Sequence, residues 1–240
     1  MTRLATSALF CAMFLLGTNA VSAATYDPAV DFATGNNPSG TWTFGAAAAP
    51  GGSVTPFAEL LYPYPDMMQR DVAAGQLPGM FLNTGSTPMT VYTSVDLEPG
   101  LLTLHPGPTG QYSVALWTAP TAGLLNMNIQ FLGVDITGTT TDVHVLHNST
   151  ELHQGPVNGY YVGPSWTDAF QVHAGDTIAL AVGYGSNGSY YYDSTGLRAT
   201  LTLSPVIPEP ISAGLGTMGL LTLGLWLFRR PKNCVAPTRA

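Results

Sequence analysis

Single-residue alternation of apolar and polar side chains is the feature that most limits how this chain can fold. Across residues 125–131, four apolar residues alternate with three amides. A strand places successive side chains on opposite faces, so this segment has one apolar face and one face with a row of amides. The same period recurs at residues 178–184 and 197–203. The alternation therefore predicts half-buried strands.

Other segments have the character of short strands: 41–46, 89–95, 101–105, 112–117, 142–147, 157–162 and 169–173. Clusters of Gly, Pro, Asn and Asp separate them, and no segment has a convincing amphipathic helical pattern. Ten such strands predict an all-β fold, an antiparallel β-sandwich that is jelly-roll-like. Region 47–87 is rich in Pro and Gly and poorly periodic, so we expect a long excursion there, with single helical turns at 59–61 and 69–74.

Composition and charge narrow the function classes. Hydrophobic residues make up 45% of the chain and charged residues 9%, against about 25% charged in a typical soluble domain. This excludes a highly charged disordered protein. Residues 24–205 carry thirteen acidic residues against Arg70 and Arg198, a balance of −11 with neutral histidines. Such a surface repels phosphate backbones, so we expect no nucleic-acid partner. Both cysteines lie outside this body, which excludes a disulfide framework.

The N-terminus has the pattern of a secretory signal peptide at residues 1–23. Arg3 supplies a positive start, residues 9–17 form a short apolar run, and Val21-Ser22-Ala23 offers small residues for cleavage. A second apolar run at 211–228 has eighteen residues without a charge, which predicts a single transmembrane helix. The basic cluster 229–232 follows, so residues 233–240 are expected to be a cytoplasmic tail and the body to be exported.

A more specific pattern precedes this span. Pro208-Glu209-Pro210 is followed by the apolar run and then by Arg229-Arg230 near the C-terminus. Together, residues 206–232 resemble the PEP-CTERM sorting signal. The resemblance implies a membrane partner, an exosortase-type processing enzyme, which would cut near the motif and release or transfer the body to the cell surface or extracellular matrix. Without cleavage, the protein would remain tethered to the membrane by one helix.

The body, residues 24–205, is also similar to a recurrent exported domain found attached to such signals. The motifs that carry this similarity are spread over most of the body: Asn37-Pro38-Ser39-Gly40, Leu104-His105-Pro106-Gly107, Trp117-Thr118-Ala119-Pro120, Gly175-Asp176-Thr177-Ile178 and Asp193-Ser194-Thr195-Gly196. Their spread predicts one domain. The resemblance implies little about function, because the domain is uncharacterised and a fold does not fix an activity.

Candidate chemistry in the body is sparse. His144 and His147 are three residues apart on a predicted strand, so they point to opposite faces and cannot share one metal ion without a bulge. His105, before Pro-Gly, is expected to be a hydrogen-bonded turn residue. The carboxylates expected in turns are Asp135, Asp142, Asp176 and Asp193. Turn hydrogen bonding is the default role for them, and one structural calcium ion is the alternative; we expect no other cofactor.

Catalysis is not expected. No serine lies in a G-x-S-x-G motif and the body has no cysteine. Pairs of carboxylates for glycoside hydrolysis come from distant strands and have no recognisable spacing. The sequence therefore predicts a protein without enzyme activity, with a hydrolase as the last alternative.

Aromatic residues suggest a binding role. Tyrosine rings exposed on a sandwich can stack on sugar faces while their hydroxyls bond sugar hydroxyls. Tyr161, Trp166 and Tyr191 are the candidate glycan contacts; packing into the core or across sheet edges is the alternative role for them. The favoured hypothesis is an exported, non-catalytic structural or adhesive β-sandwich. The alternative is a carbohydrate-binding module for extracellular polysaccharide.

Overall fold

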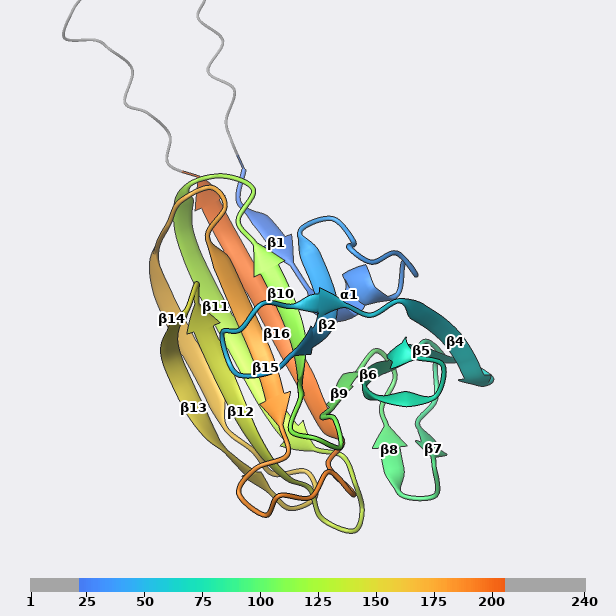
Figure 1. Cartoon of the computed structure of the whole chain (residues 1–240). Coiled ribbons are helices and arrows are strands. Elements are labelled where there is room, and N and C mark those ends of the chain that lie inside the picture. Colours follow the sequence, from blue (N-terminus) through green and yellow to red (C-terminus); the bar gives the residue numbers. More distant parts are fainter. Residues whose placement is uncertain (1–21, 206–240) are drawn as a thin grey trace, which may run out of the picture. The chain divides into compact units, whose positions relative to one another are not determined.

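The structure is a computed structural model that describes residues 22–205 (Figure 1). Two antiparallel sheets face each other in this region, so the expected all-β antiparallel fold is confirmed. Residues 22–205 contain no helix long and apolar enough to cross a membrane. The signal peptide through residue 21, Pro208-Glu209-Pro210, the span 211–228 and Arg229-Arg230 lie outside the described residues.

The first sheet has eight strands, in the order β14-β11-β16-β9-β6-β5-β4, and β1 pairs with β16. Their bounds are β1 (Ala24–Tyr26), β4 (Glu59–Tyr64), β5 (Met67–Ala73), β6 (Gln76–Asn83), β9 (Leu102–His105), β11 (Gly123–Gly133), β14 (Ser165–Val172) and β16 (Thr195–Pro205). β11 and β16 pair along their whole length, from Gly123 opposite Pro205 to Gly133 opposite Thr195. These two long strands form the centre of the sandwich.

The second sheet has six strands, in the order β13-β12-β15-β10-β2-β3. Their bounds are β2 (Trp42–Ala47), β3 (Thr55–Pro56), β10 (Tyr112–Thr118), β12 (Thr140–His147), β13 (Thr150–Asn158) and β15 (Thr177–Gly183). A separate hairpin consists of β7 (Met89–Val91) and β8 (Val95–Leu97), and one short helix, α1 (Pro28–Phe32), follows β1. The order of β9 to β16 across the two sheets supports the jelly-roll topology, which stays a prediction.

The main core lies between the two sheets. Period-two strands supply it from both sides, including Leu125 and Phe131 of β11, Leu201 of β16, and Trp42 and Trp117 of the second sheet. All five side chains are almost completely buried. A smaller second core joins β5, β6 and the β7–β8 hairpin, through residues such as Met67, Phe81, Val91 and Leu97. The excursion is thus packed on apolar groups of its own.

The structure corrects the sequence-based description of the excursion and two strands. Residues 59–61, expected as a helical turn, belong to β4. Of residues 69–74, also expected as a helical turn, 69–73 belong to β5 and Ala74 lies in the turn that follows it. The predicted strand 89–95 is instead the β7–β8 hairpin, which turns at Tyr92–Ser94. The predicted strand 157–162 begins earlier, as β13, and ends at Asn158. These differences matter for function because β5 and the hairpin build part of the candidate functional site.

Candidate functional site

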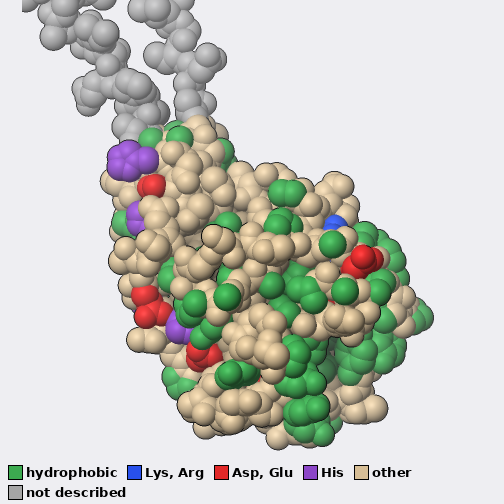
Figure 2. All heavy atoms as spheres, in the orientation of Figure 1, with side chains coloured by type: hydrophobic (Ala, Val, Ile, Leu, Met, Phe, Trp, Pro, Cys, Tyr) green, Lys and Arg blue, Asp and Glu red, His purple; other side chains and the backbone are tan. Residues whose placement is uncertain are grey.

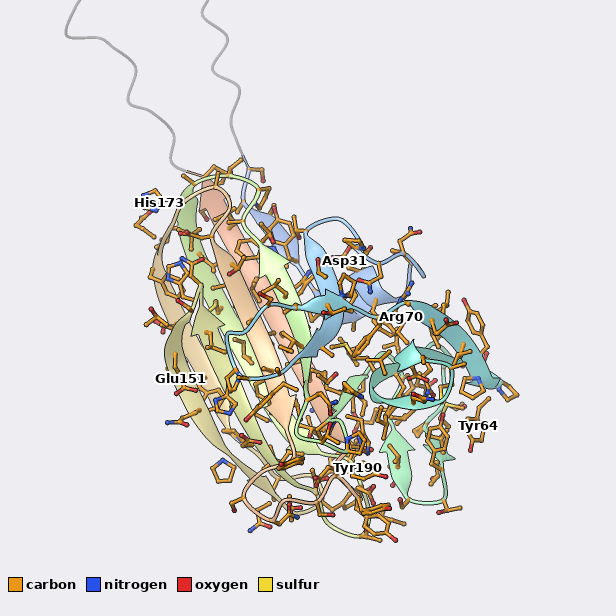
Figure 3. The ribbon with its side chains drawn as sticks, viewed as in Figure 1. Asp31, Tyr64, Arg70, Glu151, His173 and Tyr190 are labelled. Carbon is orange, nitrogen blue, oxygen red and sulfur yellow. The ribbon has the colours of Figure 1, made fainter. Side chains whose placement is uncertain are left out.

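A cavity of about 310 Å³ lies where β5, β6 and the β7–β8 hairpin meet the loop between β15 and β16. We call it the tyrosine pocket; its lining includes Tyr92, Tyr190, Tyr191 and Tyr192 together with Gln69, Phe81, His105, Asp135 and Ser194. Figure 3 labels Tyr190, at the end of the sandwich where β9 and the hairpin approach each other. The pocket therefore joins residues from both halves of the chain.

Two of the pocket tyrosines have an unusual backbone conformation. Tyr92 has φ 48° and Tyr192 has φ 64°, in the left-handed region that bulky residues rarely adopt. Tyr92 and Thr93, which also has positive φ, occupy the turn between β7 and β8 where Asn or Gly is usual. Such conformations cost about 1–3 kcal/mol each and cluster at functional sites. Aromatic rings at these positions are therefore kept at the expense of stability.

Hydrogen bonds fix the Tyr92 ring in the pocket wall. Its phenol donates to Oε1 of Gln69, and its backbone N–H donates to the phenol oxygen of Tyr64 at 3.2 Å. The amide of Gln69 then donates to both oxygens of buried Asp71, at 2.9 and 2.8 Å. Burial, and then the negative charge of Asp71, raise the pKa of Tyr92 to about 12, so the phenol remains a donor. The ring is held in place while 43% of the residue stays exposed.

The opposite wall is the run of three tyrosines. The rings of Tyr190 and Tyr191 lie 4.5 Å apart between centroids, with 30° between their planes. Tyr190 also packs edge-on against His105, at 6.2 Å. Tyr191 is 65% exposed, so most of its surface faces solvent beside the pocket. This wall offers flat apolar surface next to phenol hydroxyls.

Buried polar groups form the floor of the pocket. His105 is 8% exposed, Asp135 2% and Ser194 0%. Nδ1 of His105 pairs with the carbonyl oxygen of Pro106 at 2.9 Å, which requires Nδ1 to donate and leaves Nε2 as an acceptor. Burial lowers the pKa of His105, so the ring is neutral. Among the described residues, Oγ of Ser194 is buried without a hydrogen-bond partner. The floor thus has hydrogen-bonding capacity that the protein does not use.

The charge of the pocket limits its ligands. Asp135 is an acidic side chain in the floor, and its Oδ1 accepts from the hydroxyl of Thr137 at 2.7 Å. Among the described residues that line the pocket, none is Lys or Arg. Charged side chains are sparse on the face shown in Figure 2. The pocket therefore suits an uncharged ligand with several hydroxyl groups.

The three aromatic residues predicted from the sequence do not come together. Tyr191 lines the tyrosine pocket, whereas Tyr161 lines a different hollow beside Tyr160. Trp166, on β14, is half-buried against the main core and stacks on His153 with centroids 5.2 Å apart. One face of its ring is covered in this way, so we leave Trp166 outside the candidate site.

The histidines and carboxylates occupy separate places. His144 and His147 lie on opposite faces of β12, as expected: His144 contacts Asp142 and Glu151, while His147 packs on Phe170. His105 is hydrogen-bonded as expected, but it lies at the end of strand β9 and not in a turn, and its position in the pocket floor was missed. Between residues 22 and 205, no three side chains of His, Cys, Asp or Glu are grouped to hold a metal ion. The structural calcium ion stays a prediction, which thermal unfolding with calcium and with EDTA would test.

A larger hollow, of about 550 Å³, lies on the outer face of the second sheet beside His144. Nε2 of His144 is 2.9 Å from Oδ2 of Asp142, and its Nδ1 contacts Glu151. Burial alone would lower the pKa of His144, but its hydrogen bonds to both carboxylates outweigh burial and raise the pKa. The phenol of Tyr112 also donates to Asp142, at 2.9 Å. Both ring nitrogens are occupied, so this cluster joins strands rather than presenting a reactive group.

Comparison with known proteins gives no family for this chain. No family model matches the sequence, and no curated protein matches it. The similar solved structures include the CBM51 module from Clostridium perfringens GH95 in complex with methyl-galactose, at 12% identity over 61% of this chain and 94% of that chain, with a TM-score of 0.33. They also include the CBM35 module from Paenibacillus barcinonensis, at 14% identity over 75% and 98%, with a TM-score of 0.31.

A third is a family 35 carbohydrate binding module from Clostridium thermocellum, at 14% identity over 59% of this chain and 89% of that chain, with a TM-score of 0.27. Similarities of this size carry no argument about the ligand of this chain.

Proposed function

We propose that this protein is a non-catalytic carbohydrate-binding module and that the tyrosine pocket is its sugar site. The observation that carries the proposal is the combination of two left-handed tyrosines, Tyr92 and Tyr192, with a buried polar floor that keeps unused hydrogen-bonding capacity. Strained backbone positions of this kind cluster at functional sites, which supports a ligand site at this floor.

Sugar chemistry fits this arrangement. The C–H face of a pyranose ring packs on flat aromatic surface, here supplied by Tyr190 and Tyr191. Sugar hydroxyls can donate to Nε2 of His105 and to Asp135. With an acidic group in the floor and no cation in the lining described above, the pocket favours neutral sugars over uronic acids or sulfated sugars. Its volume is near the lower end for ligand pockets, which suits one sugar unit at the end of a chain.

The carboxyl group that lines the pocket fits sugar binding better than sugar hydrolysis. Glycoside hydrolysis usually requires two carboxyl groups on either side of the scissile bond. Asp135 is the acidic residue among the described residues that line the pocket. The geometry therefore favours the carbohydrate-binding alternative over both a hydrolase and a purely structural sandwich. An adhesive role follows directly, because a protein that binds polysaccharide also attaches to a polysaccharide matrix.

The location of this binding activity is part of the proposal. We infer export from the signal peptide pattern, and sorting by an exosortase-type enzyme from Pro208-Glu209-Pro210, the apolar run and Arg229-Arg230. The sequence pattern is what supports this inference. Mass spectrometry of the exported protein tests it: a C-terminus near Pro210 supports processing, and an intact Arg239-Ala240 contradicts it.

A glycan array tests the binding function with a matched pair of variants. Tyr191 and Tyr62 are each 65% exposed, but only Tyr191 lines the pocket, whereas Tyr62 lies on β4. We expect the parent to bind arrayed neutral glycans, Tyr191→Ala to lose at least about tenfold in affinity, and Tyr62→Ala to bind as the parent does. No retention of any arrayed glycan by the parent, or equal binding by both variants, would contradict the proposal.

A further inference from the structure

A second polar hollow, of about 360 Å³, lies on the outer face of the first sheet. Its floor comes from the outward side chains of the two central strands: Asn128 of β11 is opposite Thr200 of β16, and Gln130 is opposite Arg198. Asp27, before α1, forms part of one wall. We call this hollow the amide groove. None of its lining residues belongs to the tyrosine pocket.

The polar side chains of the amide groove are fixed in position, and some of their hydrogen-bonding groups have no partner within the described residues. Arg198 donates to Oε1 of Gln130 at 3.1 Å and also contacts Glu98, so its guanidinium is fixed between strand and loop. Among the described residues, the Asn128 side chain makes no hydrogen bond, and the amide nitrogen of Gln130 makes none either. Planar amides in this state present a donor and an acceptor to adjacent hydroxyls of a ligand.

An aromatic surface continues the amide groove at Glu98. Glu98 lines this groove and also a neighbouring hollow of about 320 Å³, whose lining includes Tyr160 and Tyr161. Burial, and then a hydrogen bond to Glu98, raise the pKa of Tyr161. The amide groove and the hollow with the two tyrosines are therefore adjacent, and Glu98 belongs to both.

The two tyrosines are positioned in advance of any ligand. Tyr161 has φ 54°, a third left-handed tyrosine, and its N–H donates to the carbonyl of Gly133 at 2.8 Å. The phenol of Tyr160 donates to Asp96 at 2.5 Å, and the two rings meet edge to face with centroids 4.5 Å apart. Their exposures are 41% and 40%, so both rings keep a large solvent-facing area. Fixed rings lose little conformational entropy when a ligand binds.

We propose that the amide groove, together with Tyr160 and Tyr161, is a second binding site that takes an internal stretch of a neutral, hydroxyl-rich polysaccharide chain. The amides of Asn128 and Gln130 bind hydroxyls, and the exposed tyrosine rings stack on a sugar further along the chain. Glu98 balances the charge of Arg198, and Asp27 and Asp96 add negative charge, so an anionic chain is disfavoured.

This inference does not rest on the tyrosine pocket, so the two sites can be tested apart. The probes are the neutral hexasaccharides of β-1,4-glucose, β-1,4-mannose, β-1,4-galactose and β-1,4-xylose, and an alginate hexamer as the anionic counterpart. Isothermal titration calorimetry measures affinity and stoichiometry for the parent and for Asn128→Ala, Tyr161→Ala and Tyr191→Ala. Asn126→Ala, on the same strand and face but outside the groove lining, and Tyr62→Ala are the matched controls.

We expect at least one neutral hexasaccharide to bind, with Asn128→Ala and Tyr161→Ala each weakening it about tenfold and the controls leaving it unchanged. Tyr191→Ala is expected to leave this component intact. Hexasaccharide binding that depends on Tyr191 alone would overturn the second site and keep the first. Binding that depends on Asn128 and Tyr161 alone would overturn the tyrosine pocket as a sugar site and keep the amide groove. Absence of binding to all four neutral probes, or stronger binding of alginate, would overturn the amide groove proposal.

Discussion

The phenol of Tyr92, on the turn of the β7–β8 hairpin, donates a hydrogen bond to the side-chain carbonyl of Gln69 on β5. Gln69 is 4% exposed, so this bond satisfies an oxygen that water scarcely reaches. The contact fixes the hairpin against the excursion and at the same time sets one wall of the tyrosine pocket. Stability and ligand geometry depend here on the same bond.

Removing this phenol tests the first of those two roles. Tyr92→Phe leaves Oε1 of Gln69 buried without its donor, and we expect a loss of about 1–3 kcal/mol in the free energy of unfolding. Urea denaturation measures this loss. Tyr62→Phe removes a phenol from a residue that is 65% exposed and is the control, expected to stay within about 0.5 kcal/mol of the parent. Equal stability of both variants would show that the bond contributes nothing.

Relief of backbone strain should separate stability from binding. Tyr192 has φ 64°, and asparagine adopts this conformation more readily than tyrosine. We expect Tyr192→Asn to stabilise the protein by about 1 kcal/mol while it weakens binding of neutral sugars. Thermal unfolding and calorimetric titration on the same sample give both quantities. A variant that is less stable than the parent would contradict the strain argument.

The His144 cluster should make stability depend on pH. Hydrogen bonds to Asp142 and Glu151 raise the pKa of His144 despite its burial; the pKa of Asp142 is lowered, because hydrogen bonds from His144, Gly185 and Tyr112 outweigh burial. The contribution of His144 is complete below its unfolded pKa, about 6.5, and is lost as pH rises through the folded value. That of Asp142 is complete above about 3.9 and is lost as pH falls through its folded value.

A neutral replacement should remove this pH dependence. We expect His144→Gln to cost about 2 kcal/mol near pH 5.5 and clearly less near pH 9, where the parent has lost the same contribution. Melting temperatures across that pH range measure the difference between parent and variant. A difference that does not change with pH would show that the imidazole is not charged in the folded protein.

Asp193 should also make stability fall as pH rises, but over a lower pH range than His144. Burial raises its pKa to about 6, against hydrogen bonds from the backbone and hydroxyl of Thr140 to Oδ1, each 3.0 Å. Among the described residues, Oδ2 is buried without a partner. Because the folded pKa of this carboxyl is raised, the free energy of unfolding falls as pH rises from about 4 through 6.

Asp193→Asn keeps the oxygen that Thr140 contacts and removes the charge. We expect it to raise stability at pH 8 by up to about 3 kcal/mol and to change it little at pH 4.5. Chemical denaturation at the two pH values measures this. Destabilisation of the variant at pH 8 would mean that the ionised carboxylate has a partner in solution.

The sequence predicted strands best where one face of a sheet meets the core and the other meets water. Residues 125–131 satisfy this condition, and they lie within β11. β5 does not: Met67 to Asp71 are all buried, because the strand is covered on both faces. Alternation is then absent, and the sequence indicates a single helical turn at residues 69–74 instead of a strand. The Tyr92 turn was missed for another reason, since tyrosine at a left-handed turn position gives no local signal of a turn.

The candidate site could be predicted only in part. The run of tyrosines drew attention to Tyr191, and the prominence of Tyr161 indicated a second exposed ring. Gln69, His105 and Asp135 reach the pocket from strands and loops that are distant in sequence, so no spacing rule connects them. Their role follows from the pairing of β5, β6 and β9, which places the excursion beside the long loops of the sandwich.

The pairing of β1 with β16 has a mechanical consequence. Ala24 is opposite Leu203, so the first and last described residues lie at the same end of the sandwich (Figure 1). The tyrosine run lies just before Thr195, where β16 begins, at the opposite end of that strand. A pull between a bound sugar and the C-terminal end would therefore load β16 lengthwise against β11, and eleven residue pairs would resist sliding together. A domain whose terminal strand is paired in this way is suited to anchorage under tension.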